Sequence, residues 1–334
     1  MIEACDLTKS YGGKVAVDHL SFIVQPGRVT GFLGPNGAGK STTMRLILGL
    51  DRPQSGSATI DGKSYDELAN PLRTVGALLE AKSVHPGRSA RNHLLFLAQS
   101  QGLPARRVDE VLDLVGLRAV AGKRAGTFSL GMSQRLGIAG AMLGDPRVLL
   151  LDEPVNGLDP EGVLWIRNLM KYLASEGRTI LVSSHLMNEM AVTADHLIVI
   201  GRGKLIADSA TADVIARSSE QSVRVVSPDA VRLTPLIEAE GGKVTPVAQS
   251  RDPGASADPA PALTVTGLGA PRIGELAASS SVVLHELSPQ LASLEEAFME
   301  LTAGSLEFGE HGQGGPPGEP ATPAPAATPG GSAR

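Results

Sequence analysis

Residues 34–41 read Gly34-Pro35-Asn36-Gly37-Ala38-Gly39-Lys40-Ser41. This stretch satisfies the pattern G-x-x-x-x-G-K-[ST] in full, and it stands between two regular elements. Residues 29–33 are bulky and continuously apolar, as in a buried parallel strand, and residues 41–49 predict a helix. This order of strand, glycine-rich turn and helix indicates a phosphate-binding loop in an α/β domain.

The phosphate loop, residues 34–41, would hold a nucleotide mainly through its backbone. Glycines let the loop amides turn toward phosphate oxygens, and the helix start adds favourable dipole charge. Lys40 would reach the β- and γ-phosphates, and the Ser41 hydroxyl would bind Mg²⁺. A glycine-rich turn can match the pattern by chance, but its flanking elements favour a nucleoside triphosphate site. The expected nucleotide contacts are Gly34, Pro35, Asn36, Gly37, Ala38, Gly39, Lys40, Ser41 and Thr42.

Short apolar runs alternate with longer helical patterns as far as about residue 215. Strands are expected at 148–151, 179–183 and 196–200, with helices near 105–115, 130–143, 160–175 and 186–193. Such alternation predicts a mostly parallel sheet covered by helices on both faces. Residues 57–62 indicate a hairpin at the edge of that sheet. Residues 1–215 are therefore predicted to form one α/β domain.

The chain changes character after residue 215. Strands are expected at 222–226, 262–266 and 281–285, and helices at 229–239, 270–278 and 293–303. These elements predict a small α+β extension over 216–304, in which no chemical motif is found. Residues 305–334 contain six prolines and seven glycines, and we expect this tail to be disordered because it has too little apolar surface to bury.

The composition limits the class of protein. The chain has 334 residues, 42% of them hydrophobic, and a net charge of −5, so a wholly disordered protein is excluded and a general nucleic-acid binder is disfavoured. No apolar run is long enough to span a membrane, and the N-terminus does not resemble a secretory signal. The single cysteine, Cys5, permits no internal disulfide. We therefore expect a soluble, cytosolic protein.

Two adjacent carboxylates follow the expected strand 148–151. Asp152 would belong to the Mg²⁺ shell, and Glu153 would orient or deprotonate the water that attacks the γ-phosphorus. An acidic pair after an apolar strand is usually no more than a strand end. Together with the phosphate loop, it predicts the second half of a nucleotide-hydrolysing site.

The stretch from 128 to 135, called the signature stretch below, resembles the L-S-G-G-Q signature of ABC transporter ATP-binding subunits. It reads Phe128-Ser129-Leu130-Gly131-Met132-Ser133-Gln134-Arg135, with substitutions at Phe128, Leu130 and Met132. Ser129 at a helix start could be an ordinary N-cap, but with the backbone amides it also forms an anion site. The resemblance, which covers residues 1–215, implies that Ser129 and Gly131 face the γ-phosphate bound by a second subunit. Two ATP molecules would then lie between two subunits.

Three further matches follow the order of this family. Asp159, in Gly157-Leu158-Asp159, matches the loop through which the two sites communicate across the dimer. His185 matches the histidine that contacts the γ-phosphate, and Tyr11 matches the aromatic residue that stacks on adenine. The resemblance thus implies Lys40, Glu153 and His185 as catalytic residues, and ATP as the nucleotide.

Glu80 is a departure from the family, which usually has glutamine at the end of strand 75–79. A glutamate here resembles the ATP-binding subunits of bacitracin-type and lantibiotic-type systems. Glu80 would reach Mg²⁺ or the attacking water, or it is a surface acid if the register is shifted. With the first reading, the expected metal ligands are Ser41, Asp152 and Glu80.

The resemblance implies a transporter, and this chain would then need separate integral-membrane permease subunits. They would dock on the helical region near 80–125, where Arg88, Arg91, Arg106 and Arg107 either contribute or are merely solvated. Residues 293–298 resemble the extension of drug-exporting, daunorubicin-type ATPases, which favours export and a docking or regulatory role for the extension. The implied protein is peripheral, at the cytoplasmic face of the membrane, and paired with a second ATP-binding subunit in what we expect to be a homodimer. The sequence does not reveal the substrate.

Other nucleotide-binding classes fit less well. A GTPase would need Asn-Lys-x-Asp, which the sequence lacks, and a small-molecule kinase would not carry the signature stretch. The alternative that stays open is a soluble ATPase of the same family that acts on ribosomes or DNA.

Overall fold

The computed structural model describes residues 1–80, 83–218, 222–247, 260–290 and 294–302. Its centre is a six-stranded sheet in the order β5-β6-β7-β3-β8-β9, in which all neighbours are parallel except the pair β8 and β9. The strands span Val75–Leu78, Val148–Asp152, Thr179–Ser183, Val29–Leu33, His196–Gly201 and Lys204–Ala210, in that spatial order. Every residue of β3 and β7 is buried, as their continuous apolar sequence predicts. The predicted parallel sheet is confirmed.

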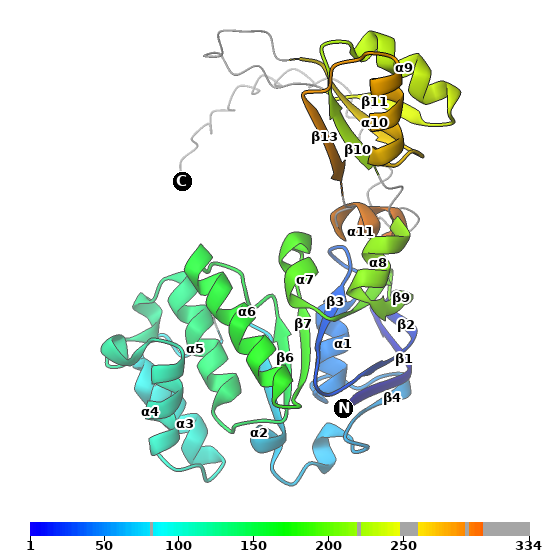
Figure 1. Ribbon diagram of the computed structural model, residues 1–334. Helices are drawn as coiled ribbons and strands as arrows, with labels where there is room; N and C mark the ends of the chain where they lie inside the picture. Colours follow the sequence, from blue (N-terminus) through cyan, green and yellow to red (C-terminus); the bar gives the residue numbers. More distant parts are fainter. Residues whose placement is uncertain (81–82, 219–221, 248–259, 291–293, 303–334) are drawn as a thin grey trace, which may run out of the picture.

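Helices cover this sheet and form a layer of their own at one side (Figure 1). That layer consists of α3 (Ala90–Ser100), α4 (Arg106–Leu114) and α5 (Leu130–Met142), which pack on one another. Around the sheet lie α1 (Lys40–Ile47), α6 (Pro160–Ser175) and α7 (Met187–Thr193). Short turns of helix connect them: α2 (Pro71–Thr74) and 3₁₀ turns at Tyr65–Glu67, Arg118–Val120 and Ala125–Thr127. One apolar core joins the helical layer to the sheet.

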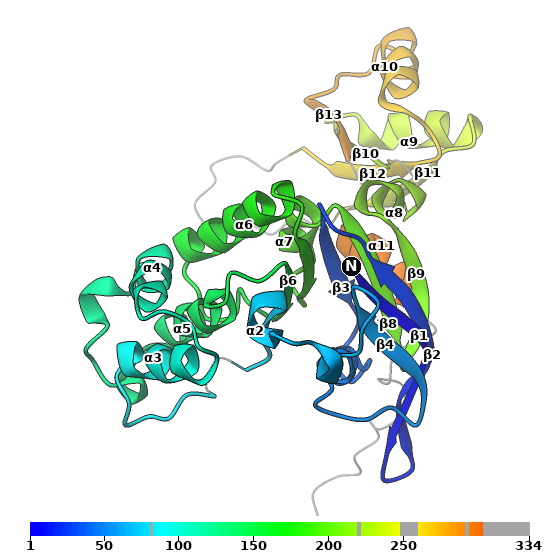
Figure 2. The same cartoon turned by 90° about the horizontal axis from the view of Figure 1, so that it is seen from below.

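The strand within residues 57–62 belongs to a second sheet and not to the edge of the parallel sheet, where the sequence predicts it. β1 (Ile2–Tyr11), β2 (Lys14–Val24) and β4 (Ser55–Ile60) form a separate antiparallel sheet in the order β2-β1-β4 (Figure 2). The hairpin predicted at the edge of the parallel sheet is therefore wrong. The turn at Asp61-Gly62 closes only a single bridge, between Ile60 and Lys63, while Ile60 pairs in register with Ile2. β4 thus pairs with β1, which is distant in sequence, and not with the segment just after the turn.

The extension holds a four-stranded antiparallel sheet in the order β11-β12-β10-β13, with its own apolar core. In chain order the elements are β10 (Ser222–Val226), α9 (Ala230–Ala239), β11 (Lys243–Pro246), β12 (Ala262–Thr266), α10 (Ala270–Ser279) and β13 (Glu286–Gln290). This is a split β-α-β-β-α-β arrangement. The strand predicted at 281–285 is wrong, because β13 begins at Glu286. The backbone of Ser281 is left-handed, and the Val282 amide donates to the Ala277 carbonyl, so this apolar run closes α10 instead.

Two helices lie between this sheet and the first domain (Figure 1). They are α8 (Thr211–Ser218) and α11 (Leu294–Thr302), and α11 packs against α7, α8 and β9. Leu294, Ala297 and Phe298 of α11 belong to the same core as Met190 of α7. The end of the extension thus returns to the first domain. The predicted tail, 305–334, lies outside the described residues.

Within the described parts of the chain, no helix combines the length and the apolar character that crossing a membrane requires.

Candidate active site

The phosphate loop joins β3 to α1, and its glycines are required by close backbone contacts. Gly39 has φ +104°, and a Cβ on it would lie 2.3 Å from the Ala16 carbonyl oxygen. A Cβ on Gly34 would lie 2.6 Å from the Ile200 carbonyl oxygen. The loop therefore packs closely against β2 and β8, and a side chain at either glycine would distort its backbone.

The Lys40 side chain folds back over the loop. Its Nζ donates to the carbonyl oxygens of Gly34, at 2.6 Å, and Pro35, at 3.2 Å, and the residue is only 9% exposed. Burial lowers the pKa of the Lys40 ammonium, and the nearby carboxylates of Glu153 and Asp152 oppose that shift. The ammonium thus lies against the loop to which the sequence assigns the phosphate groups.

Ser41 and Asp152, which are far apart in sequence, meet at the start of α1. The Ser41 hydroxyl donates to Asp152 Oδ2 at 2.6 Å, and the Ser183 hydroxyl donates to the other oxygen of the same carboxylate. One hydroxyl and one carboxylate beside a phosphate loop are the hard oxygen donors that Mg²⁺ prefers. The residues present therefore fit a magnesium ion.

Glu153 and His185 form the second pair of the site. Glu153 Oε2 lies 2.8 Å from His185 Nδ1, and it also accepts from the His185 backbone amide at 3.4 Å. The pairing of β6 with β7 sets Asp152 opposite Ser183, so the residues after both strands project from one edge of the sheet. The structure brings Lys40, Ser41, Asp152, Glu153 and His185 together at this edge, where the sequence predicts the site.

Two residues in contact with this site were missed by the sequence reasoning. Ser183 bonds Asp152, and the buried amide of Gln134 donates to the Glu153 carbonyl oxygen at 2.9 Å. Ser183 could have been found, because it ends a strand beside Asp152. Gln134 lies in the signature stretch, but its spacing does not predict that it reaches Glu153.

The two other predicted motifs occupy the starts of helices. Ser129 is the N-cap of α5 and accepts from the Met132 amide at 3.2 Å; Asp159 is the N-cap of α6 and accepts from the Gly162 amide at 2.9 Å. A Cβ on Gly131 would lie 2.8 Å from the Gly157 carbonyl oxygen. The signature stretch is therefore packed against the loop before Asp159 within one chain.

Tyr11 lies at the end of β1 and is 46% exposed. Its hydroxyl donates to Asp51 Oδ2 at 2.8 Å, and the Lys9 ammonium lies 5.1 Å from the ring centroid. Burial and the Asp51 carboxylate raise the pKa of the Tyr11 hydroxyl. The hairpin that carries Tyr11 leads directly to Ala16, which touches the phosphate loop.

Glu80 follows β5 by two residues, and Leu78 of β5 pairs with Leu151 of β6. Its side chain is exposed and accepts a hydrogen bond from the Ser83 hydroxyl at 3.3 Å. Of the three expected metal ligands, the structure thus brings Ser41 and Asp152 into contact, whereas the hydrogen bond of Glu80 is made elsewhere.

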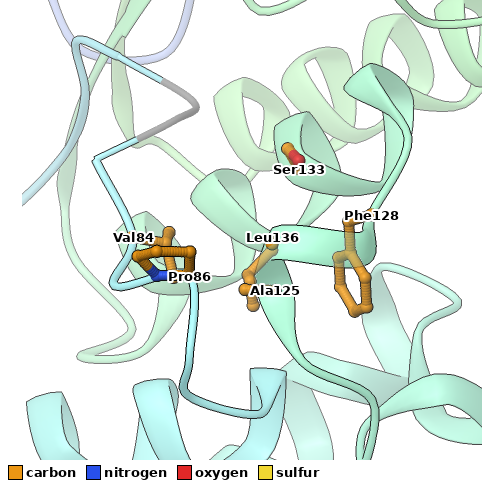
Figure 3. A pocket seen from close by; sticks show the side chains of 7 residues that line it. Val84, Pro86, Ala125, Phe128, Ser133 and Leu136 are labelled. Atoms are coloured by element: carbon orange, nitrogen blue, oxygen red, sulfur yellow. The ribbon is translucent and has the colours of Figure 1, made fainter.

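Two cavities adjoin along α5. The first, of about 380 Å³, lies between the segment after β5 and the signature stretch; Figure 3 shows Val84 and Pro86 on one side and Ala125, Phe128, Ser133 and Leu136 on the others. The second, of about 370 Å³, shares Val84 and Leu136 and continues toward the end of α1 and α3. Its lining is mainly apolar and includes Leu48, Leu50, Leu72, Leu79, Leu97 and Ala141, with Glu80 and His93.

Family models match two parts of the chain. The model described as "ABC transporter" matches residues 17–156, and one described as "AAA domain, putative AbiEii toxin, Type IV TA system" matches residues 124–191. A domain of unknown function (DUF8746) matches residues 221–295, which hold the sheet of the extension.

Curated relatives are similar over the first domain, and one of them over nearly the whole chain. The bacitracin transport ATP-binding protein BcrA of Bacillus licheniformis is 45% identical over 209 residues, which are 62% of this chain and 68% of the relative. The lantibiotic transport ATP-binding protein SrtF of Streptococcus pyogenes is 36% identical over 62% of this chain and 89% of its own. The uncharacterized ABC transporter ATP-binding protein YdbJ of Bacillus subtilis is 33% identical over 91% of this chain and 96% of its own.

A solved structure supports the same fold. The dimeric, post-hydrolysis ATP-binding cassette MJ0796, bound to ADP and phosphate, is 25% identical, with a TM-score of 0.58. The match covers 63% of this chain and 99% of that structure.

Glu80→Gln tests whether this carboxylate lies near the metal when nucleotide is bound. We expect the variant to keep ATPase activity but to need roughly several-fold more Mg²⁺ for half-maximal rate, because one hard anionic donor is lost. Rates measured at fixed ATP over a Mg²⁺ titration give this value. Glu238→Gln, an exposed residue of α9, serves as the control. Superimposable titration curves for Glu80→Gln and the unaltered protein would assign Glu80 to the surface.

Proposed function

The chain belongs to the family of ABC transporter ATP-binding proteins, and from this premise we propose that it energises the export of a drug, antibiotic or peptide. It is an ATPase, the ATP-hydrolysing subunit of a multi-subunit transporter. The observation that supports export most directly is the 45% identity to a bacitracin transport protein. The similarity to a lantibiotic transport protein supports the same class of substrate.

The chain's own residues divide the chemistry between them. Lys40 holds the β- and γ-phosphates, and Ser41 with Asp152 holds Mg²⁺, with Glu80 as the third proposed ligand. The ion, when bound, neutralises phosphate charge. Glu153 orients the attacking water and accepts its proton, and His185 contacts the γ-phosphate. Tyr11 stacks on adenine.

The working unit proposed here is a dimer of two such ATP-binding subunits, with a second copy of this chain as the partner. Ser129 and Gly131 stand at the start of α5, where a helix N-terminus attracts phosphate oxygens of the partner's ATP. The loop before Asp159 packs on Gly131 and would carry information between the sites. ATP binding closes the dimer because the closed state binds ATP more tightly, and hydrolysis reopens it.

The membrane subunits are proposed to dock in the second cavity, between the end of α1 and the helical layer. Its apolar lining fits one face of a short cytoplasmic helix. Phe96 of α3 is 50% exposed, with the Arg88 guanidinium stacked 4.5 Å from its ring centroid. Arg91 and Arg107 are instead bonded to Asp109 and Glu110, so their charges serve the helical layer itself. This docking places the protein at the cytoplasmic face of the membrane.

Isolation under mild detergent from membranes of the native host tests the transporter assignment. We expect an integral-membrane protein in stoichiometric amount. Leu50→Asp should lose that partner while still binding ATP, because Leu50 is 55% exposed and lines the cavity. Leu164→Asp, 50% exposed on α6, is the matched control and should keep it. Ribosomal or nucleic-acid partners without a membrane protein would overturn export and favour the soluble alternative.

Glu153→Gln tests the proposed base. The variant should bind ATP normally, hydrolyse it at least about a hundredfold more slowly, and accumulate as a closed dimer with ATP. Steady-state hydrolysis and size-exclusion chromatography with ATP measure both effects. Normal turnover would remove Glu153 from the base role.

We propose that the extension, residues 216–304, acts on hydrolysis through α11. This helix packs against α7, which begins two residues after His185. Leu294, Ala297 and Phe298 are buried at this contact. A movement of the extension would therefore shift α7 and with it the position of His185. If the extension only stabilises the fold, the rate of ATP hydrolysis would not depend on this contact.

Phe298→Ala separates these two roles. The Phe298 side chain is 7% exposed, so its removal weakens the packing of α11 against α7 and α8. Hydrogen exchange of α7 and α8 should therefore rise. If α11 regulates the site, kcat falls roughly several-fold while KM for ATP is unchanged. Met299→Ala, 51% exposed on the same helix, should change neither quantity. Raised exchange with an unaltered kcat would leave α11 a stabilising role only.

A further inference from the structure

The backbone of Glu153 has a conformation that side-chain-bearing residues rarely adopt. Its φ is +50°, in the left-handed region, which is disfavoured for a residue with a Cβ. Such a conformation persists only where neighbouring groups hold it. Because the direction of the Glu153 carboxylate follows from this backbone angle, the groups that hold it also aim the carboxylate.

Hydrogen bonds reach Glu153 from both sides of its peptide backbone. Its amide donates to the Ser183 carbonyl oxygen at 3.2 Å and to the Ser183 hydroxyl at 3.0 Å. Its carbonyl oxygen accepts from the Asn156 amide at 3.2 Å and from Gln134 Nε2 at 2.9 Å. Among these partners, Gln134 is the one that belongs to the helical layer.

Gln134 is only 3% exposed, and it stands on a helix that is itself held firmly. The next residue, Arg135, donates to the Val115 carbonyl oxygen at 3.2 Å and stacks 4.8 Å from the centroid of Trp165. At the start of the same helix, Gly131 packs against Gly157. A buried amide on a fixed helix can define the position of a carbonyl group closely, because neither partner is free to move or to bond water.

We infer that Gln134 is a positioning residue for ATP hydrolysis. Its amide holds the Glu153 carbonyl, so that the carboxylate points to His185 and to the place of the attacking water. Gln134 acts through Glu153 and not on ATP. Since α5 also begins with Ser129, one helix carries both the residue that meets the partner's ATP and the residue that aims this chain's own base. This inference rests on the proposed role of Glu153.

Gln134→Met tests the inference, because methionine fills a similar volume without a donor. We expect kcat to fall about tenfold, while KM for ATP and nucleotide affinity stay within about twofold. Gln134→Glu is a second variant that guards against disturbed packing, because it keeps the shape of the side chain and replaces the amide donor with an acceptor. It should also lower kcat while KM for ATP stays nearly unchanged. Gln99→Met, an exposed glutamine on α3, is the control and should match the unaltered protein.

Adding Gln134→Met to Glu153→Gln distinguishes positioning from general support. If Gln134 acts through Glu153, the double variant hydrolyses ATP in a single turnover no more slowly than Glu153→Gln alone. A further tenfold loss, or an unaltered kcat in both Gln134 variants, would overturn the inference. Normal turnover of Glu153→Gln would instead refute the proposed base, and these outcomes can be told apart.

Discussion

The parallel pairing of β6 with β7 is the constraint on which the site depends. It sets Asp152 opposite Ser183, so that the two residues bond through their side chains, and it leads Glu153 and His185 out of the sheet side by side. β7 also pairs with β3, which leads into the phosphate loop. Because the carboxyl ends of parallel strands share one edge, two strand pairings collect residues that are more than a hundred positions apart.

The site residues with the clearest sequence signal are those whose signal is local. The phosphate loop is recognisable because its glycines, strand and helix are contiguous, and Asp152 and Glu153 because they end an apolar strand. The strands of the parallel sheet are continuous apolar runs, which have few alternatives. In these segments the conformation that the local sequence favours is the one found in the structure.

The residues that the sequence predicted poorly depend on distant partners. Ile60 forms a strand with Ile2, although the adjacent Asp61-Gly62 turn indicates a hairpin. The run at 282–284 is apolar enough for a strand, but it closes α10. Gln134 lies in the signature stretch, but the sequence does not indicate its partner, since a buried amide on a helix has many potential partners and only the packing of α5 on the sheet selects the Glu153 carbonyl.

The same packing explains why Glu153, the proposed base, can be held in a disfavoured conformation. A strained backbone needs partners that do not yield, and Glu153 has Ser183 on the sheet and Gln134 on the helical layer. Those two layers must keep their mutual position for the carboxylate to stay aimed. A small movement of the helical layer relative to the sheet would therefore change the direction of the Glu153 carboxylate. The cavity proposed for docking lies between these same two layers, so a membrane partner seated there would act on the contact that holds the Glu153 backbone.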